Sequence, residues 1–376
     1  MKIGILGGGQ LAQMLAQAGI PLGMEFMFLC PSEEACAAPL GQHLCAGFDD
    51  TTALDRLRRW ADVVTFEFEN VPASALEALA GYTQVHPPAG ALAVAQDRVR
   101  EKQAFDALDL PTAPYAAVDS LEQLGKAVGE LGLPALLKTR THGYDGKGQA
   151  VLKQNADLFP AWERLGGFPL ILEAFVPFRR ELSIIAVRAA TGETRCYPLS
   201  ENHHREGILR LSFSRSSDPL QALSERYVQQ LMQRLDYVGT LALELFQTEA
   251  GLLANEIAPR VHNSGHWTIE GASCSQFENH LRAICGLPLG DTSLTRPAAM
   301  VNLIGQLPAP EALAAVPGAI PHIYGKAERA GRKLGHVTLT ADGQVFDAPF
   351  QHRLARLLSI ADEQGLAASI EGLTST

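Results

Sequence analysis

Short apolar runs alternate with segments of helical spacing over the first 95 residues, and glycine, proline and polar residues separate them. A strand, a glycine turn, a helix and a second strand follow one another from the start of the chain. This order is typical of a Rossmann-like α/β domain. The predicted strands cover residues 2–6, 25–29 and 63–66, and the predicted helices cover residues 11–18, 54–60 and 71–80.

The turn after the first strand begins with three glycines, Gly7, Gly8 and Gly9, and leads into a helix N-terminus, where anions are favoured. Gly7, Gly9 and Ala12 also match the dinucleotide pattern G-x-G-x-x-A. However, the second strand ends in Cys30-Pro31-Ser32, without the carboxylate that a ribose 2′-hydroxyl requires. We therefore expect the helix to bind another phosphate, and a purely structural turn is the alternative.

Two acidic residues, Glu67 and Glu69, follow the strand at 63–66. Open α/β sheets place ligands at the carboxyl ends of their strands, so Glu67 and Glu69 are candidate ligand-binding residues. Acidic residues at this position are also common helix caps, which is the structural alternative.

A second glycine-rich stretch follows the apolar run at 133–137. Lys138 ends that predicted strand, and a loop with Gly143, Gly146, Lys147 and Gly148 follows it. Glycines let backbone N–H groups converge on an anion, and lysines add point charges for phosphate oxygens. The loop is compatible with a flap over a nucleoside triphosphate. On spacing alone, a hairpin turn with solvated lysines is equally compatible.

Further apolar runs in the middle of the chain predict strands at 149–153, 170–176 and 181–187. A polar segment at 197–204 then ends in His203 and His204. Adjacent residues of a strand point to opposite faces, so at most one of the two histidines can serve a given site.

The sharpest local prediction concerns a hairpin formed by residues 241–246 and 253–257. A three-residue loop at 249–251 would set Glu244 opposite Glu256 on one face. Opposed carboxylates repel each other unless a cation lies between them, and Mg²⁺ shared with nucleotide phosphates suits that geometry. One protonated glutamic acid, or a register shifted by one, is the alternative. Asn255 faces the other way unless the strand is irregular.

Basic and polar donors gather in the next loop and in the last part of the chain. Residues 258–267 contain an arginine, two histidines and an asparagine, which indicates an anion site beside the carboxylate pair. A smaller strand-containing tail starts at 298–304. Its basic turns at 325–326 and 331–336 are compatible with phosphate binding or with solvated surface.

Composition limits the classes of function. A chain of 376 residues predicts two or three domains, and we place them at 1–95, 96–290 and 291–376. A formal net charge of −10 argues against nucleic acid and anionic membranes as partners. No stretch approaches the roughly 20 apolar residues of a membrane span. Six scattered cysteines without a C-x-x-C pair predict reduced thiols in a cytoplasmic protein.

Taken together, these segments resemble the ATP-grasp superfamily. The carriers of the resemblance are Lys138, the glycine loop at 143–149, the strand segment at 173–176, and Glu244 with Asn255 and Glu256. More narrowly, residues 9–11, 110–114, 143–149, 258–267 and 331–336 are similar to the family of 5-(carboxyamino)imidazole ribonucleotide synthases of purine biosynthesis. The resemblance runs nearly end to end. His142 departs from it where many members carry glycine, and His203 precedes the expected His204.

The resemblance implies a fold and a reaction. The fold is an ATP-grasp fold, mixing α/β and α+β, with a Rossmann-like pre-ATP-grasp domain and a small C-terminal domain. The reaction is ATP-dependent carboxylation of 5-aminoimidazole ribonucleotide by bicarbonate, through carboxyphosphate, giving ADP and phosphate. Mg²⁺ is the implied metal, and a cytoplasmic homodimer without nucleic-acid or membrane partners is the implied form.

The resemblance also implies site residues. ATP would be bound by Arg98, Lys138, Gly143, Tyr144, Asp145, Gly146, Lys147, Gly148, Gln149, Glu173, Ala174, Phe175, Val176, Glu181, His204, Asn255 and Glu256. Mg²⁺ would be bound by Glu244 and Glu256. Bicarbonate and carboxyphosphate would be held by the catalytic residues Arg260, His262 and Asn263. The ribonucleotide would be surrounded by Gly8, Gly9, Gln10, Tyr144, Asp145, Arg332 and Lys333, and we add Glu67 from its place at the sheet edge.

Other readings stay open at the level of sequence. A nicotinamide-dependent oxidoreductase would use the Gly7 turn, and protection against unfolding by NAD rather than ATP would identify it. A nucleotide-binding regulator would bind ATP without turnover. Within the superfamily, the formate-dependent formyltransferase of the same pathway shares a related plan.

Overall fold

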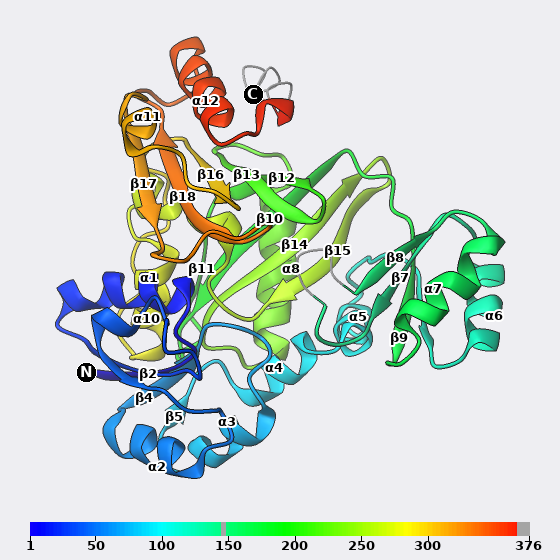
Figure 1. Ribbon diagram of the computed structural model, residues 1–376, viewed down its shortest axis with the longest axis horizontal. Coiled ribbons are helices and arrows are strands. Elements are labelled where there is room, and N and C mark those ends of the chain that lie inside the picture. The colour runs from blue at the N-terminus through cyan, green and yellow to red at the C-terminus, as the bar shows by residue number, and fades with distance from the viewer. Residues whose placement is uncertain (144–147, 367–376) are drawn as a thin grey trace.

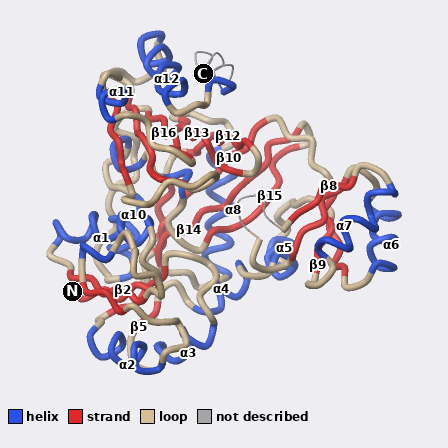
Figure 2. The backbone as a smooth tube through the Cα atoms, viewed as in Figure 1, coloured by secondary structure: helices blue, strands red, loops and turns tan. Residues whose placement is uncertain are grey.

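A computed structural model describes residues 1–143 and 148–366 of the chain, and three β-sheets organise these residues. A long central sheet takes in the strands of the C-terminal part at the upper left, the N-terminal sheet lies below these at the lower left, and a small sheet projects on the right (Figure 1). Strands form the interior of each part, and most helices run along the outside (Figure 2). The mixed α/β architecture expected from the apolar pattern is confirmed.

The N-terminal sheet is parallel, with strand order β3-β2-β1-β4-β5. Helix α2 begins earlier than predicted because Asp50 caps it, accepting hydrogen bonds from the N–H groups of Thr52 and Ala53. The strands are β1 (Lys2–Leu6), β2 (Glu25–Leu29), β3 (Gln42–Leu44), β4 (Val63–Phe66) and β5 (Gln84–Val85). The helices are α1 (Gln10–Gly19), α2 (Thr51–Trp60), α3 (Ala73–Ala80) and α4 (Ala89–Ala95).

The projecting sheet is antiparallel, with strand order β6-β9-β7-β8. Helices α6 and α7 cover it (Figure 1). Strand β9 ends at Ala174, short of the predicted 176, whereas β7 runs to Thr139 and therefore includes Lys138. The elements are β6 (Tyr115–Val118), α6 (Leu121–Leu131), β7 (Ala135–Thr139), β8 (Gln149–Leu152), α7 (Leu158–Leu165) and β9 (Leu170–Ala174).

The central sheet has nine strands in the order β15-β14-β10-β12-β13-β16-β18-β17, with β11 on β10. It crosses the predicted boundary at 290, because β16 from the tail pairs with β13. Its strands are β10 (Arg180–Arg188), β11 (Thr194–Cys196), β12 (Leu199–Arg205), β13 (Ile208–Arg215), β14 (Gly239–Thr248), β15 (Gly251–Ala258), β16 (Ala298–Ile304), β17 (Ala319–Ile323) and β18 (Lys333–Thr340). The boundaries at 95 and 290 stay predictions.

Helices connect the three sheets. Phe105 of α5 packs in one core cluster with Leu243 and Leu245 of β14, and Leu15 of α1 packs in another with Leu281 of α10. The remaining helices are α5 (Arg98–Asp106), α8 (Gln221–Arg234), α9 (Thr268–Gly271), α10 (Gln276–Ile284), α11 (Pro310–Ala314) and α12 (Ala348–Ile360). Short 3-10 turns lie at Ile20–Leu22, Ala38–Leu40, Asn155–Asp157, Asn263–Gly265 and Gln364–Leu366.

The β14–β15 hairpin reaches the predicted register by a different route. Thr248 pairs with Gly251, so the loop has two residues and the predicted three-residue loop is wrong. Continuing that register would set Glu244 opposite Asn255. A β-bulge next to Glu244 inserts one residue into β15, and Glu244 therefore faces Glu256, as predicted.

The bulge also changes the face to which β15 residues point. Leu252 and Ala254 are buried in the core cluster beneath the hairpin, and the next residue in that cluster is Ile257. An unbroken strand would have placed residue 256 there, because side chains alternate with a period of two. The irregularity at Asn255 therefore keeps Glu256 out of the core and Ile257 within it.

Two expectations from composition can be compared with the structure. All six cysteines are free in the structure. Within the two described ranges, no helix has the length and apolar character needed to cross a bilayer.

Candidate active site

The opposed carboxylates of the hairpin each meet a basic side chain. His262 Nε2 lies 3.2 Å from Glu244 Oε1, and Arg98 Nη1 lies 2.9 Å from Glu256 Oε2. Burial acts to raise the pKa of the Glu256 carboxyl, but the Arg98 guanidinium outweighs it and lowers this pKa to about 2. Glu256 is therefore ionised at neutral pH, and the alternative of one protonated glutamic acid cannot apply to it.

Lys138 lies on the neighbouring sheet and is held by Glu173. Its Nζ is 2.8 Å from Glu173 Oε2, and both side chains are largely buried. Burial acts to raise the pKa of Glu173, and the ammonium groups of Lys138 and Lys102 together hold it below its usual value. Lys138 also acts on Glu256 through its charge. Two cations, Arg98 and Lys138, therefore converge near the carboxylate pair.

The base of the glycine loop is ordered by hydrogen bonds around Gly148. Gly148 has a φ of +71°, and a Cβ there would stand 2.7 Å from Thr139 Oγ1. Its carbonyl accepts a hydrogen bond from Thr139 N–H at 2.8 Å, and Gln149 pairs with Lys138. Glycine is therefore required at 148. Gly143 is also described, whereas the predictions for Tyr144, Asp145, Gly146 and Lys147 lie outside the described residues.

Some backbone groups of the segment predicted to bind adenine already form hydrogen bonds within the protein. The N–H groups of Ala174 and Phe175 donate to the carbonyls of Pro114 and Pro134, at 2.9 and 3.2 Å. The N–H groups of Ala174 and Phe175 therefore already have acceptors in the protein, and Glu173 lies within the sheet, paired with Tyr115 and Leu136. Val176 lies just past β9, and its carbonyl accepts a hydrogen bond from Phe178 N–H at 3.0 Å.

The adjacent histidines have different partners. His204 Nδ1 lies 2.9 Å from Glu181 Oε2, whereas the His203 ring stacks on Phe213. Burial acts to lower the pKa of His204, and Glu181 raises it above its usual value. Only His204 therefore contacts Glu181, in agreement with the prediction that at most one of the two histidines can serve a given site.

The loop at 258–267 is held by residues from both terminal parts of the chain. Arg260 Nη2 lies 2.6 Å from Glu69 Oε1, so the second of the two acids after β4 holds the arginine. The side-chain amides of Asn263 and Asn302 donate to each other, at 3.1 and 2.7 Å. Asn302 is a buried residue of β16 that no sequence pattern singled out.

Ser264 orients the His262 ring through Nδ1, the nitrogen on the side away from Glu244. His262 Nδ1 lies 2.8 Å from Ser264 Oγ and accepts a hydrogen bond from Ser264 N–H at 3.4 Å. A backbone N–H can only donate, so the neutral ring carries its proton on Nε2, the nitrogen facing Glu244. Ser264 Oγ lies 2.6 Å from the buried Ser183 hydroxyl, which accepts from Asn202 at 3.0 Å.

The glycine turn at α1 contains an anion supplied by the protein itself. The Glu67 carboxylate accepts hydrogen bonds from the N–H groups of Gly9 and Ala12, the latter at 3.0 Å. A Cβ at Gly7 would overlap the Glu67 side chain. Burial raises the pKa of Glu67. Glu67 is therefore the cap of α1, which is the structural alternative considered for it.

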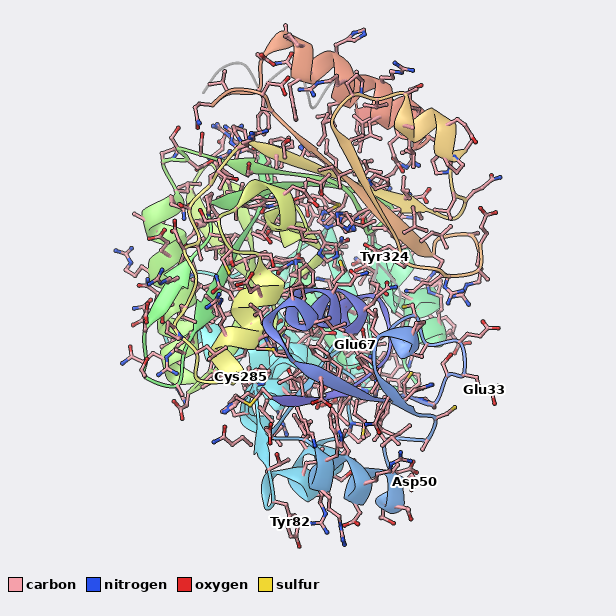
Figure 3. All side chains as sticks on the ribbon, turned by 90° about the vertical axis from the view of Figure 1, so that its left-hand side faces the viewer. Glu33, Asp50, Glu67, Tyr82, Cys285 and Tyr324 are labelled. Atoms are coloured by element: carbon pink, nitrogen blue, oxygen red, sulfur yellow. The ribbon has the colours of Figure 1, made fainter. Side chains whose placement is uncertain are left out.

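Lys326 reaches the same turn from the C-terminal part of the chain. Its Nζ donates a hydrogen bond to Gln10 Oε1, and burial lowers the pKa of this ammonium. Figure 3 labels Glu67, just past the end of β4, and Tyr324, two residues before Lys326, on the segment above it. In the sequence, Gly325 directly before Lys326 was the feature that could have indicated a phosphate-binding role for this lysine. Arg332 donates to Ala327 carbonyl at 3.1 Å, and Lys333 begins β18.

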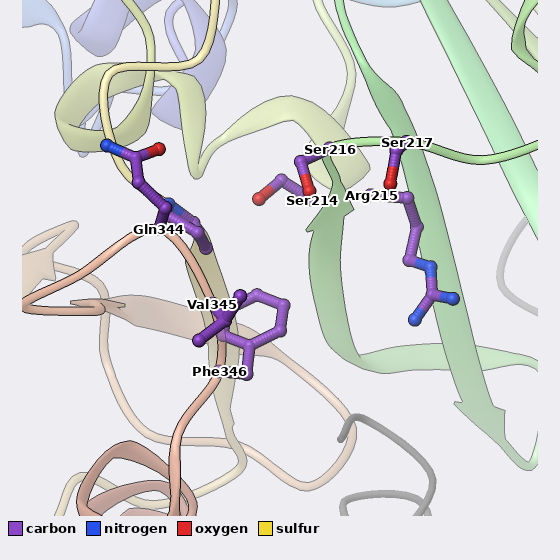
Figure 4. A pocket seen from close by; sticks show the side chains of 8 residues that line it. Ser214, Arg215, Ser216, Ser217, Gln344, Val345 and Phe346 are labelled. Carbon is purple, nitrogen blue, oxygen red and sulfur yellow. The ribbon is translucent and has the colours of Figure 1, made fainter. Parts of the chain in front are cut away.

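Two cavities lie apart from these residues. The smaller, about 20 Å³, lies between Ser214–Ser217 and Gln344–Phe346 and has room for little more than one water (Figure 4). The larger, about 490 Å³, lies beside the segment from Leu110 to Tyr115. Neither is lined by the opposed carboxylates, so cavity size does not locate the site here.

Comparison with known protein families gives matches along the chain. Residues 1–96 match the ribonucleotide synthetase preATP-grasp domain, and residues 103–277 match the ATP-grasp domain. Residues 298–345 match the phosphoribosylaminoimidazole carboxylase C-terminal domain.

Individual relatives extend this result over nearly the whole chain. The N5-carboxyaminoimidazole ribonucleotide synthase of Pseudomonas aeruginosa is 54% identical, with 96% of this chain and 100% of that protein covered. The crystal structure of the synthetase from Thermus thermophilus is 53% identical with a TM-score of 0.90, covering 95% of this chain and 98% of that one.

A third relative carries ligands. The synthase of Aspergillus clavatus, crystallised in complex with ADP and 5-aminoimidazole ribonucleotide, is 30% identical with a TM-score of 0.88, and 96% of this chain and 98% of that one are covered. The match over nearly the full length decides against the nicotinamide-dependent oxidoreductase. The chain belongs to the N5-carboxyaminoimidazole ribonucleotide synthases, ligases of the ATP-grasp fold that carry out the ATP-dependent carboxylation of 5-aminoimidazole ribonucleotide in purine biosynthesis.

Proposed function

We propose that the reaction takes place where the β14–β15 hairpin, the projecting sheet and the α1 turn meet, with bicarbonate as the carboxyl source. The observation that carries this assignment is the opposed pair Glu244 and Glu256, with Arg98 on one side and His262 on the other. A pair of carboxylates can hold a metal ion bound to a nucleotide, and the basic side chains on either side of the pair suit the nucleotide phosphates and a small anion.

The carboxylate pair fits Mg²⁺. Mg²⁺ takes oxygen ligands and is commonly bound through one or two carboxylates together with substrate phosphates. Among residues 1–143 and 148–366, no group of three or more His, Cys, Asp or Glu side chains could hold a metal. We therefore assign Glu244 and Glu256 to an ion that is bound together with the nucleotide. Such an ion would neutralise charge on the transferring phosphoryl group.

The nucleotide would be bound by the cations and by the projecting sheet. Arg98 and Lys138 would approach the phosphates, since each is a basic side chain near the carboxylate pair. Glu181 and His204 would hold the ribose, and the backbone at 173–176 would bind the adenine. The glycine loop at 143–149 and Asn255 complete the predicted ATP site.

Bicarbonate would be held by the donors of the loop at 258–267. Arg260, the Nε2–H of His262 and the amide of Asn263 are the donors assigned to it. An oxygen of bicarbonate attacks the γ-phosphorus of ATP, the bond to the β-phosphate oxygen breaks, and ADP leaves with that electron pair. The product is carboxyphosphate. The substrate amine then gains the carboxyl group, a proton leaves the nitrogen, and phosphate is released.

The ribonucleotide would bind between the α1 turn and the C-terminal part. Gly8, Gly9 and Gln10 form one wall, and Arg332 and Lys333 lie in the basic turn of the other. We add Lys326, because its ammonium contacts Gln10 directly. Glu67 would act by fixing the turn. Tyr144 and Asp145 stay predictions from the resemblance, as do the homodimer and the cytoplasmic location.

An assay of ADP release tests the proposal. The purified chain receives ATP and Mg²⁺ with either aminoimidazole ribonucleotide plus bicarbonate or glycinamide ribonucleotide plus formate. We expect ADP release only with the first pair. Release with formate would favour the formyltransferase, and ATP binding without release in either mixture would favour a regulator.

A further inference from the structure

Helix α5 contacts the bulge of β15 at three successive residues. Lys102 Nζ donates to the Asn255 carbonyl at 2.8 Å, and Arg98 is paired with the Glu256 carboxylate. Glu101 Oε1 accepts a hydrogen bond from Ile257 N–H at 2.6 Å. One turn of one helix therefore holds residues 255, 256 and 257.

The segment that follows α5 holds the residue before the bulge. Pro111 carbonyl accepts from Ala254 N–H at 2.7 Å, and Thr112 Oγ1 donates to Ala254 carbonyl at 2.7 Å. Thr112 Oγ1 also accepts a hydrogen bond from Lys102 Nζ at 2.9 Å. Lys102 and Thr112 therefore form one connected clamp on the carbonyls of residues 254 and 255.

Lys102 is unusual in being almost completely buried, with 1% of its surface exposed. Burying an ammonium is costly unless other groups compensate it. The charges of Glu173 and Glu101 offset part of this cost, whereas the two acceptors that Lys102 Nζ contacts directly are a hydroxyl and a carbonyl. Hydrophobic packing of Phe105 on the same helix would hold α5 against the hairpin without a buried charge. The position of this ammonium therefore points to a role at the bulge carbonyl.

The bulge is the feature that decides where Glu256 points. Without it, the two-residue turn would set Asn255 opposite Glu244 and would turn Glu256 toward the core cluster. The carbonyl of a bulged residue is left outside the ladder, and an ammonium, which can only donate, is a suitable partner for it.

We propose that Lys102 is a positioning residue of the metal site: together with Thr112 it fixes the Asn255 bulge and thereby sets Glu256 opposite Glu244. This inference rests on the proposed role of these two carboxylates in binding Mg²⁺. Lys102 touches neither nucleotide nor substrate in this assignment and acts on Glu256 through the backbone of β15, in addition to its charge near Glu173.

The test measures metal binding in the intact chain, separately from nucleotide binding. Thermal unfolding of the protein with saturating ADP is followed as Mg²⁺ is added, and ADP affinity is measured in EDTA. The variants are Lys102→Met, which keeps the length of the side chain, and Thr112→Val, which keeps its shape. Thr112→Ser restores the hydroxyl. Thr240→Val is the matched control, because Thr240 is a buried threonine of β14 whose hydroxyl donates to the Gln276 carbonyl, away from the bulge.

We expect Lys102→Met to raise the apparent dissociation constant for Mg²⁺ about tenfold, and Thr112→Val about threefold, the loss typical of a buried hydrogen bond. ADP affinity in EDTA should stay within about twofold, and Thr112→Ser and Thr240→Val should resemble the parent chain. Amide hydrogen exchange at Ile257 should become faster in both clamp variants, and not in Thr240→Val.

Three results would overturn the proposal. Unchanged Mg²⁺ affinity in Thr112→Val and in a folded Lys102→Met would remove the positioning role while leaving the metal site intact. Equal losses of ADP and Mg²⁺ binding would indicate general damage to the site. If the parent chain itself shows no added stability from Mg²⁺ with ADP, the proposed metal site is wrong, whatever the variants do.

Discussion

Glu67 Oε2 accepts a hydrogen bond from Ala12 N–H at 3.0 Å, so a carboxylate from the end of β4 caps the helix that begins at the glycine turn. Helix N-termini carry partial positive charge and favour an anion. Here that anion is internal, and it ties the turn at residues 7–10 to the sheet edge. The protein itself therefore holds the turn in place, and its shape depends on the absence of side chains at Gly7 and Gly9, where a Cβ would overlap Glu67.

Substitution of Gly7 by alanine should disturb that cap. Gly7 has a φ of +119° and its added methyl group would overlap Glu67, so we expect a loss of about 2 kcal/mol in the free energy of unfolding. The KM for the ribonucleotide should rise about tenfold, because the displaced turn carries Gln10. Gly23→Ala is the control, since Gly23 also has a positive φ but nothing lies within 4 Å of its added Cβ. Equal effects at both positions would mean that backbone strain alone is responsible.

Replacement of Lys326 by methionine should weaken ribonucleotide binding selectively. The substitution removes the ammonium beside Gln10 and keeps most of the apolar stem, so we expect the KM for the ribonucleotide to rise about tenfold. The KM for ATP should be unchanged. Lys126→Met, at an exposed lysine of α6, is the control. A rise in the KM for ATP alone would place Lys326 at the other substrate.

The variant Glu256→Gln should abolish ADP release while the fold stays intact. It removes one charge from the proposed metal site, and we expect kcat to fall about a hundredfold or more. Circular dichroism should match that of the parent chain. Glu249→Gln, an exposed glutamate in the turn of the same hairpin, should keep full activity. Full activity in Glu256→Gln would remove the metal assignment.

Stability should fall in mild acid because of His280. This ring contacts Thr65 Oγ1 at 2.9 Å and accepts from Thr240 N–H at 3.1 Å, which joins the N-terminal sheet to β14. Burial lowers its pKa to about 3, from 6.5 in the unfolded chain. The unfolded state therefore binds the proton first, and stability present above 6.5 is lost as the pH falls toward 3.

The expected loss attributable to His280 is about 2 kcal/mol between pH 7 and pH 5. Denaturant unfolding of the parent chain and of His280→Gln at both pH values measures it. The variant should be less stable at pH 7 and should show a smaller decline. His352→Gln, at an exposed residue of α12, should decline as the parent chain does. Parallel declines in all three proteins would show that other groups control the acid sensitivity.

Several features of this protein follow from local sequence. The apolar runs of β1, β2 and β4 and the helical spacing between them predict the parallel N-terminal sheet, because burial of apolar side chains selects the strand period. The opposition of Glu244 and Glu256 was predicted correctly, but from a three-residue loop that the hairpin does not have, since the two-residue turn alone would set Glu244 opposite Asn255. The resemblance supplied the family, which the comparisons confirm.

Other features depend on packing. The turn of the β14–β15 hairpin is shorter than predicted, and the bulge that compensates for it contacts Lys102, 153 residues away from Asn255 in the chain. Glu67 is predicted to bind a ligand but caps α1, and Glu69 holds Arg260. The strand alternation near Asn255 changes phase between Ala254 and Ile257, a signal that could have indicated the bulge.

Local sequence specifies which segments are strands and helices, where glycine is obligatory, and which acidic and basic residues are available for a metal–nucleotide site. Which of these residues meet, as Lys326 and Gln10 do across 316 residues, is specified by the packing of the whole chain. The reason is that periodicity reports burial along one element, whereas contacts between elements depend on how three sheets pack against one another.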